Sequence, residues 1–346
     1  METRFLGNSG LKVSALAFGT MTFGGKGQFQ QMGSVQVDEA RRLVDLCLDA
    51  GVNLFDTADV YSQGASEEIL GQALGNRRDE VILATKVHGR MGDGPNDVGQ
   101  SRHHIIRACE DSLRRLGTDY IDLYQVHGFD TLTPLEETLG ALDDLVRSGK
   151  VRYIGCSNYS AWHLMKALCI SERKGLERFV SQQVYYSLVA RELEYELVPL
   201  SLDQGLGILV WSPLAAGFLS GKFRRGRQEP EGTRRSQRGD PGTIDEERGY
   251  DIIEVLDEIA QEHDATIAQT ALNWVLRKPG VTSVLVGART EEQLKENLEA
   301  ASWEMAEEDV RRLDQISATP PIYPYWHQRR FNSERIPQGS GVRTSR

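Results

Sequence analysis

Four side chains capable of acid–base chemistry follow consecutive apolar segments of this sequence. Asp56 ends the segment NLFD and Tyr61 lies shortly after it, whereas Lys86 and His127 end the next two segments, VILATK and YIDLYQVH. A lysine at the end of a buried segment needs a charged partner, and we expect Asp56 to hold it in its charged form. A cation about 4 Å from a phenol favours the ionised form by roughly 4 kcal/mol at an effective dielectric constant of about 20. Tyr61 is therefore the candidate proton donor, and His127 the candidate that orients the oxygen atom receiving the proton.

The elements that must position these residues alternate between short apolar strands and amphipathic helices. The apolar runs are continuous, which is typical of parallel strands covered on both faces. We predict strands at 15–20, 53–56, 80–87, 120–127, 151–158, 179–184, 207–213 and 283–287. We predict helices at 38–51, 66–75, 101–117, 135–149, 160–175, 196–205, 244–264, 266–280 and 291–301. This order predicts a single (β/α)8 TIM barrel domain at 1–318, in which the carboxyl ends of all strands meet at the face that carries the active site.

The alternative α/β fold is a doubly wound sheet. If such a sheet binds a dinucleotide, it needs a glycine-rich turn between its first strand and its first helix. The stretch MTFGGKGQF after the first strand does not have the spacing G-x-G-x-x-G opening directly into a helix, and this favours the barrel. A turn at GNSG (7–10) between short apolar runs predicts an additional N-terminal β-hairpin.

Two segments interrupt the regular pattern. The first, 220–243, is a loop after the seventh strand with seven Lys or Arg residues, and its length indicates either a functional or a solvated loop. The second, 319–346, is a C-terminal extension that begins with TPPIYPYWHQRRF. Its aromatic part either covers the mouth of the barrel or packs beside it against an outer helix, and the pattern leaves both placements open. Its end, QGSGVRTSR, is expected to be disordered.

The composition restricts the classes of partner. The formal net charge of -10 argues against nucleic acid as a partner, because phosphate binding needs a basic surface. No run of about 18 apolar residues is present, so no membrane-spanning helix is expected. The first residues contain no long apolar run, so we expect no signal peptide and a cytoplasmic location.

The cysteines and paired histidines do not suggest a metal site. Cys47, Cys109, Cys156 and Cys169 form no C-x-x-C pair, and we expect buried, reduced thiols. His103 and His104 are adjacent at a helix start and therefore face different directions, so we expect surface or cap residues. We predict no metal.

Around the four acid–base residues the chain resembles the aldo-keto reductase superfamily, over nearly all of residues 4–315. The matching stretches are GTMTFGG, NLFDTADVYSQGASEEILG, VILATKV, LRRLGTDYIDLYQVHGFDTLTPLEETLGALDDLVRSGKVRYIGCSNYS, SQQVYYSL, WSPLAAGFLSGK and GARTEEQLKENL. The stretches YQVHGFD and TPLEETL, together with WSPL in place of a tyrosine, resemble the branch of aryl-alcohol dehydrogenases and potassium-channel β-subunits. The eighth strand departs from many relatives, because SVLVGART lacks their Ile-Pro before the glycine.

The resemblance implies hydride transfer from NADPH to an aldehyde or ketone, reversibly, with Asp56, Tyr61, Lys86 and His127 as the catalytic tetrad. It implies that the nicotinamide lies among Ser157, Asn158 and Gln183 with Trp211 stacked on its ring. The other implied cofactor-binding residues are Gly19, Thr20, Met21, Asp56, Ser212, Pro213, Leu214, Gly217, Leu219, Gly221, Lys222, Gly287, Ala288, Arg289, Gln293, Glu296 and Asn297. The stretch GARTEEQLKENL is itself typical of an anion site, since a glycine turn opens a helix beside an arginine. Arg289 and Lys222 would favour the 2′-phosphate of NADP(H).

The substrate and the biological role are less constrained. Aromatic residues suggest an apolar or aromatic carbonyl substrate, and the pocket candidates are Phe23, Tyr61, His127, Tyr323, Tyr325 and Trp326. The loop HGRMGDGPNDVGQSRHH (88–104) contains few aromatic residues that would define the pocket. Three functions fit the pattern: a carbonyl reductase, an NADPH-binding regulatory or redox-sensing subunit with slow turnover, and a metal-dependent barrel hydrolase. The oligomeric state is left open.

Overall fold

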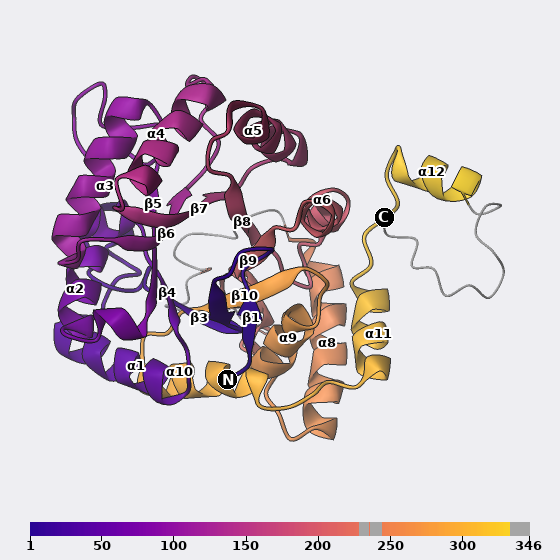
Figure 1. Ribbon diagram of the computed structural model, residues 1–346. Helices are drawn as coiled ribbons and strands as arrows, with labels where there is room; N and C mark the ends of the chain where they lie inside the picture. The colour runs from indigo at the N-terminus through magenta and orange to yellow at the C-terminus, as the bar shows by residue number, and fades with distance from the viewer. Residues whose placement is uncertain (228–234, 236–243, 333–346) are drawn as a thin grey trace.

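Eight parallel strands close into a barrel in the order β10-β3-β4-β5-β6-β7-β8-β9 (Figure 1). The computed structural model describes residues 1–227, 235 and 244–332. The barrel strands are β3 (Leu16–Gly19), β4 (Leu54–Asp56), β5 (Ile82–Val87), β6 (Ile121–Val126), β7 (Val151–Ser157), β8 (Phe179–Tyr185), β9 (Gly207–Trp211) and β10 (Val281–Val286). Each strand predicted from an apolar run is present, and the predicted (β/α)8 barrel is confirmed.

Helices surround the barrel and connect successive strands (Figure 1). The α-helices are α1 (Val37–Asp49), α2 (Ala65–Leu74), α3 (Arg102–Leu116), α4 (Leu135–Arg147), α5 (Ala161–Lys174), α6 (Leu197–Gln204), α8 (Glu246–Glu262), α9 (Ile267–Leu276), α10 (Glu291–Leu298), α11 (Glu307–Ile316) and α12 (Tyr325–Asn332). The short 3-10 helices are η1 (Gly27–Phe29), η2 (Tyr61–Gly64), η3 (Arg78–Glu80), η4 (Glu192–Glu194), η5 (Ala215–Ser220) and η6 (Glu299–Ala301). The predicted helices are present, and α11 and α12 were not predicted.

Local sequence signals explain several helix ends. The side chain of Ser101 accepts a hydrogen bond from the backbone N–H of His104 at the start of α3, and Gly117 ends that helix in a left-handed conformation. Thr266 and Gln269 form a reciprocal capping box at the start of α9. These caps satisfy backbone groups that would otherwise lack partners at helix termini.

An antiparallel hairpin of β1 (Thr3–Phe5) and β2 (Lys12–Ser14) closes the amino-terminal end of the barrel. Leu6 and Val13 of this hairpin are completely buried, and they pack with the inward-facing barrel residues Ala17, Leu54, Ala84, Leu123, Leu209 and Leu285. Gly7 has φ +58° and lies so close to the loop before β9 that an added Cβ would stand 2.4 Å from the carbonyl oxygen of Gly205. The hairpin predicted from GNSG is therefore the floor of the barrel.

Strand alternation places polar side chains directly above this apolar floor. Because side chains alternate between the two faces of a strand, the residue two positions after an inward-facing one also points inward. Leu54 is followed in this way by Asp56, and Ala84 by Lys86. Both of these polar residues are buried. The lumen thus changes from apolar to ionic within one layer of side chains.

The C-terminal extension lies beside the barrel. The ring of Tyr325 stacks on Tyr195 at 5.6 Å between centroids, and its hydroxyl donates to a carboxylate oxygen of Glu196 at 2.5 Å. These contacts join the extension to the start of α6, and Figure 1 shows α12 standing clear of the strands beyond α6. The structure therefore supports the placement against an outer helix. The basic run at 228–234 and 236–243 and the predicted disordered end, QGSGVRTSR, lie outside the described residues.

One expectation for a single residue was wrong, and another was confirmed only in part. Cys47, Cys109 and Cys156 are buried as expected, but Cys169 is exposed because it lies on the solvent face of α5. His104 is 3% exposed, so it is not a surface residue, but its backbone N–H donates to the capping side chain of Ser101, as the alternative expectation of a cap residue had it. Within the described part of the chain, no helix is both long and apolar enough to cross a membrane.

Candidate active site

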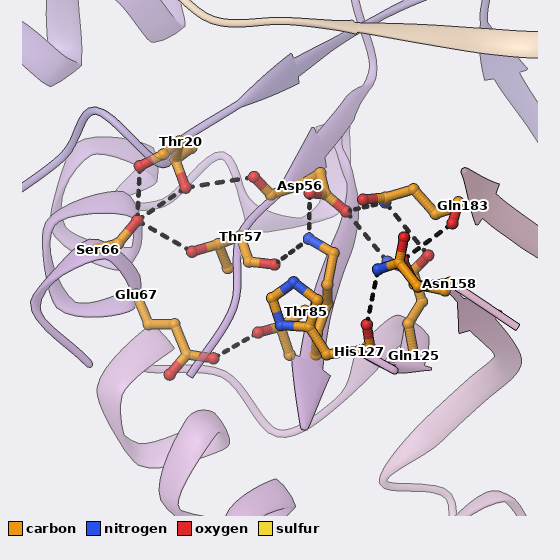
Figure 2. A network of polar contacts seen from close by, with 12 residues as sticks. Thr20, Asp56, Thr57, Ser66, Glu67, Thr85, Gln125, His127, Asn158 and Gln183 are labelled. Atoms are coloured by element: carbon orange, nitrogen blue, oxygen red, sulfur yellow. Dashed lines mark hydrogen bonds and ion pairs between the residues drawn. The ribbon is translucent and has the colours of Figure 1, made fainter. Parts of the chain in front are cut away.

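Lys86 and Asp56 form a buried ion pair in the barrel lumen (Figure 2). The Lys86 side chain is completely buried, and its amine also donates to the backbone carbonyl of Thr57 at 2.8 Å. Burial opposes the charge on Lys86, but the negative charges of Asp56 and Tyr61 and the hydrogen bonds to both outweigh it, so the pKa of Lys86 is raised. The lysine is therefore a fixed cation at neutral pH.

Two glutamines complete the surroundings of the Asp56 carboxylate. Gln125 and Gln183 donate from their side-chain amides to the second carboxylate oxygen of Asp56, at 3.0 and 2.8 Å (Figure 2). One oxygen of this buried carboxylate thus faces the Lys86 cation and the other accepts two hydrogen bonds, so the group is held in place from both sides. Gln183 was predicted as a site residue and Gln125 was not. Gln125 lies near the end of β6, two residues before His127, and this spacing is the signal that could have identified it.

Tyr61 lies over this ion pair at the carboxyl end of β4. The amine of Lys86 stands 5.1 Å from the centroid of the Tyr61 ring, and the ring packs edge-on against His127 at 5.7 Å. Phe29, which was not predicted as a site residue, packs against the same ring at 5.4 Å. The tetrad residues predicted from three separate strands are therefore brought together.

The backbone after Tyr61 is held in an uncommon conformation. Ser62 and Gln63 have φ values of 51° and 55°, in the left-handed region that side chains with a Cβ rarely adopt. The hydroxyl of Ser62 donates to the carbonyl of Phe23 at 2.8 Å and accepts from the backbone N–H of Gly25 at 2.9 Å. These bonds tie the Tyr61 turn to the loop after β3, and such strain is common at functional sites.

His127 is neutral in this site. Burial, together with the nearby Lys86 cation and His88, lowers the pKa of His127 to about 3. Its backbone N–H donates to the carbonyl of Val87, and its carbonyl accepts from the Asn158 side chain at 3.0 Å. The imidazole therefore offers one hydrogen-bond donor and one acceptor beside Tyr61, and it is no source of an acidic proton near neutrality.

A second polar network lies on the outer side of the barrel, between α2 and the strands β4 and β5 (Figure 2). Thr85, next to Lys86 in sequence, donates to the fully buried carboxylate of Glu67 at 2.5 Å, and Arg115 donates to its other oxygen at 2.6 Å. The hydroxyl of Ser66 lies 2.9 Å from that of Thr20 and 3.0 Å from that of Thr57. Because α2 provides Glu67 and Ser66, this helix braces both β4 and β5.

The residues implied for the nicotinamide also converge. The side-chain amide nitrogen of Asn158 donates to the Ser157 hydroxyl at 2.9 Å. The side-chain oxygen of Asn158 accepts from the indole N–H of Trp211 at 3.1 Å. Trp211 stacks on Tyr185 at 4.8 Å between centroids, with 22° between the ring planes. One face of the indole is thus supported by Tyr185, which leaves the opposite face as the surface suited to a planar ring.

The loop after β9 provides a backbone cradle. Ser212, Ala215, Ala216, Gly217 and Gly221 all have positive φ values. At Gly217, whose φ is +94°, no atom lies within 4 Å of where a Cβ would stand. Successive turns of this kind orient backbone N–H groups toward one side, where they suit an anion. Pro213 and Leu219 are buried, so only their backbone is suited to ligand contact.

Two cations near strand ends lack an acidic partner among the described residues. No ion pair joins Arg289 or Lys222 to a carboxylate in that part of the chain. Arg289 precedes Thr290, whose hydroxyl caps α10 by accepting from the backbone N–H of Gln293. Gln293 accepts in turn from the backbone N–H of Arg289 at 3.0 Å. A free guanidinium beside a helix N-terminus fits a phosphate group, and the residues present therefore fit a phosphorylated dinucleotide.

The other residues implied for the adenine and pyrophosphate ends of the cofactor make contacts within the protein. Asn297 donates to the carbonyl of Gly287 at 3.5 Å, and the backbone carbonyl of Glu296 accepts from Gln269. Ala288 accepts a hydrogen bond from Thr22 through its carbonyl. Leu214 is half-buried.

Several predicted pocket residues lie elsewhere. Phe23 is completely buried and packs on Phe18 at 5.8 Å, in the core outside the barrel. Tyr323 and Trp326 are 73% and 46% exposed on the C-terminal extension and contact each other. Of the residues implied for cofactor binding, Thr20 is buried in the hydroxyl network of α2, and its neighbours Gly19 and Met21 are half-buried. Phe29 is the aromatic residue that the structure places on Tyr61.

The described residues contain no cluster of side chains that could bind a metal ion. No group of three or more His, Cys, Asp or Glu side chains there is arranged to hold a metal ion. His104 has a buried Nε2 atom without a hydrogen-bond partner, but it stands apart from any such group.

Comparisons with known proteins extend over almost the whole chain. The model of the aldo/keto reductase family matches residues 15–318. A protein of Bacillus subtilis (strain 168) named "Uncharacterized oxidoreductase YrpG" is 40% identical over 333 residues, covering 92% of this chain and 97% of the relative. An Arabidopsis thaliana protein named "Probable voltage-gated potassium channel subunit beta" is 38% identical over 308 residues, covering 87% of this chain and 91% of the relative. A Schizosaccharomyces pombe (strain 972 / ATCC 24843) protein named "Putative aryl-alcohol dehydrogenase C977.14c" is 35% identical over 343 residues, covering 92% of this chain and 96% of the relative.

Proposed function

The chain belongs to the aldo/keto reductase family, and we propose that it reduces aldehydes or ketones to alcohols with NADPH as the hydride source and Tyr61 as the proton donor. The observation that carries the proposal is the completely buried Lys86 cation, which is paired with Asp56 and lies beneath the Tyr61 ring beside His127. Burying a cation costs free energy, so the buried Lys86 is better explained by a role in the chemistry of the site than by a contribution to stability. It is well placed to influence the Tyr61 proton.

The four side chains divide the work of protonation. Asp56 keeps Lys86 charged, and the Lys86 cation favours the ionised form of Tyr61, so the phenol releases its proton more readily. His127, being neutral, can donate a hydrogen bond to the carbonyl oxygen without competing as an acid. When bound, NADPH supplies the hydride that adds to the carbonyl carbon. Tyr61 gives its proton to the carbonyl oxygen, so that an alcohol leaves, and the same groups act in reverse for alcohol oxidation.

The preference for NADPH over NADH rests on two cations. Arg289 and Lys222 have no carboxylate partner in the described part of the chain, and a 2′-phosphate would supply one. Ser157, Asn158 and the open face of Trp211 would hold the nicotinamide end. Asn158 and Trp211 are already fixed by mutual hydrogen bonding, so they need little reordering when the cofactor binds.

A second function is favoured by one comparison. The 38% identity to a protein named as a channel β-subunit suits a cofactor-binding regulatory or redox-sensing subunit in which turnover is slow. The two functions differ in an observable way. A reductase exchanges cofactor at every turnover, whereas a sensing subunit retains it.

The test is to follow NADPH oxidation with aromatic and aliphatic aldehydes, ketones and quinones, comparing wild type with Tyr61→Phe. The substitution removes one hydroxyl and keeps the ring, and we expect a loss of at least about a hundredfold in kcat/KM, as for removal of a general acid. Tyr323→Phe, at the exposed tyrosine of the C-terminal extension, is the matched control and should change little. Turnover that survives Tyr61→Phe would show that another group donates the proton. No turnover with any compound, with NADPH tightly bound, would favour the regulatory subunit.

A further inference from the structure

His88 stands beside His127 at the mouth of the barrel, and the proposed mechanism does not use it. In the pairing of β5 with β6, Lys86 is opposite Gln125 and Val87 is opposite Val126. Continued by one residue, the same register sets His88 opposite His127. His88 also lies two residues after the inward-facing Lys86, so strand alternation directs it to the lumen side. The ring is half-buried, and repulsion by its protonated form is among the influences that lower the pKa of His127.

A buried glutamine fixes the orientation of the His88 ring. Gln100 is 1% exposed, and its side-chain nitrogen lies 3.2 Å from Nδ1 of His88. The same nitrogen donates to the backbone carbonyl of Gly128, and the Gln100 oxygen accepts from the Tyr159 hydroxyl at 3.3 Å. Because a carbonyl needs a donor and a hydroxyl can supply one, these two contacts determine which end of the amide is nitrogen.

This arrangement determines where the imidazole proton lies. An amide nitrogen only donates hydrogen bonds, so Nδ1 of His88 must accept and carries no proton in the neutral ring. The proton is therefore on Nε2, which points away from Gln100. Burial lowers the pKa of His88, and the nearby Asp130 carboxylate raises it. Burial has the larger effect, so the pKa of His88 is lowered. The ring is neutral near pH 7. No group among the described residues accepts a hydrogen bond from Nε2.

We propose that His88 determines substrate specificity by donating a hydrogen bond from Nε2 to an acceptor atom of the substrate that is separate from the reacting carbonyl. This inference rests on the proposed reductase function and adds a substrate class to it. The class is carbonyl compounds with a second, uncharged acceptor, such as an ether oxygen, a second carbonyl or a ring nitrogen. A neutral donor suits uncharged acceptors, and a hydrogen bond at a half-buried position is worth a preference of about three- to tenfold.

The first test uses matched substrate pairs. These are 4-methoxybenzaldehyde with 4-ethylbenzaldehyde, and pyridine-3-carbaldehyde with benzaldehyde, in which the acceptor is present or replaced at nearly constant shape. The measured quantity is the ratio of kcat/KM within each pair. His88→Leu should lower this ratio by about three- to tenfold relative to wild type, mainly through KM, since binding and not chemistry is lost. Comparing the variant with wild type cancels the intrinsic reactivity of the aldehydes.

Three further variants make the result specific. His88→Gln places an amide N–H near the position of Nε2 and should restore much of the ratio. His103→Leu changes an exposed histidine on α3 and should leave the ratio as in wild type. Gln100→Leu removes the group that fixes the tautomer and should lower the ratio without touching the substrate. Thermal unfolding of each variant shows that it is folded.

The second test does not depend on turnover. Nitrogen-15 NMR of the imidazole, assigned by the loss of the signal in His88→Gln, reports which ring nitrogen carries the proton. We expect the Nε2-protonated tautomer, and an Nδ1-protonated ring would overturn the inference. Wild-type turnover with ratios that His88→Leu leaves unchanged would also overturn it while the reductase function stands. If wild type reduces none of the aldehydes, ketones and quinones of the wider panel, the proposed function fails and this inference fails with it.

Discussion

Thr85 donates a hydrogen bond to the carboxylate of Glu67 over 2.5 Å, on the side of β5 opposite to the one from which Lys86 enters the lumen. The strand that presents the lysine is thereby anchored to α2 at the adjacent residue. Arg115 of α3 binds the other oxygen of the same carboxylate. A fully buried carboxylate thus connects one strand and two helices directly behind the site.

Removing this carboxylate should destabilise the fold. Glu67→Gln leaves Arg115 without a negatively charged partner, and the Arg115 side chain is only 18% exposed. Breaking a buried pair in this way costs about 3 kcal/mol or more. Urea unfolding should show that loss, whereas Arg41→Gln, which breaks an exposed pair with Asp38, should cost less than about 1 kcal/mol. Equal losses in the two variants would mean that Glu67 does not anchor the strand.

Asp56→Asn should make activity depend on pH in a new way. Burial opposes the charge on Lys86, and without the Asp56 charge its pKa falls. Wild type should keep the cation across neutral pH, but the variant should lose it as pH rises. We therefore expect a deficit in kcat/KM of at least about tenfold near pH 8 that becomes smaller toward pH 6, since one pKa unit changes the ratio of the two forms tenfold. Asp45→Asn, at an exposed partner of Arg77, is the control. A deficit independent of pH would contradict the role given to Asp56.

His127 should make stability fall in acid. Its pKa is lowered to about 3 by burial, Lys86 and His88, whereas a histidine in the unfolded chain titrates near 6.5. Between these two pKa values the imidazole is protonated in the unfolded state and neutral in the folded state. This contribution to stability is fully present above about pH 6.5, and about 1.4 kcal/mol is lost for each pH unit below that.

Urea unfolding between about pH 7 and about pH 5 checks this dependence. In His127→Gln the corresponding part of the slope should disappear, whereas His103→Gln, at an exposed position, should retain it. Identical slopes in wild type and His127→Gln would show that the buried imidazole accepts a proton in the folded state.

Arg289→Ala should weaken the binding of NADPH but hardly that of NADH. The guanidinium has no carboxylate partner in the described segments, and charge-assisted bonds to phosphate are strong. We expect the dissociation constant of NADPH, measured by fluorescence quenching, to rise at least about tenfold. Arg311→Ala, at an exposed arginine of α11, is the matched control. A rise of less than about threefold would remove the role given to Arg289.

The barrel could be predicted from the sequence, and so could the meeting of Asp56, Lys86 and His127 at one face, because both follow from the order and alternation of the strands. Asp56, Lys86 and His127 end apolar runs, and parallel strands bring such ends to one face. Gln125 obeys the same rule and could have been predicted from its spacing to His127. Phe29 could not, because it lies in a short helix whose contact with Tyr61 depends on how two loops fold against each other.

Contacts between distant segments explain the other differences. Glu67 faces Thr85 only because α2 packs on β5, and nothing in either local pattern encodes that pairing. Tyr323 and Trp326 were expected in the pocket on account of their aromatic character. Their segment is instead held by Tyr325, whose hydroxyl reaches Glu196, 129 residues away in the chain. Aromatic character predicts that a residue packs, but not which surface it packs on.

The hairpin that forms the floor of the barrel also restricts how ligands can enter and leave. With Leu6 and Val13 completely buried among the lumen residues, the amino-terminal end of the barrel is closed by packed side chains, so ligands must enter and leave at the carboxyl ends of the strands. Whatever lies deepest must arrive first and depart last. On the proposed function, a nicotinamide held by Asn158 and Trp211 would share this end of the barrel with the carbonyl compound, so the order in which the two enter and leave would be linked.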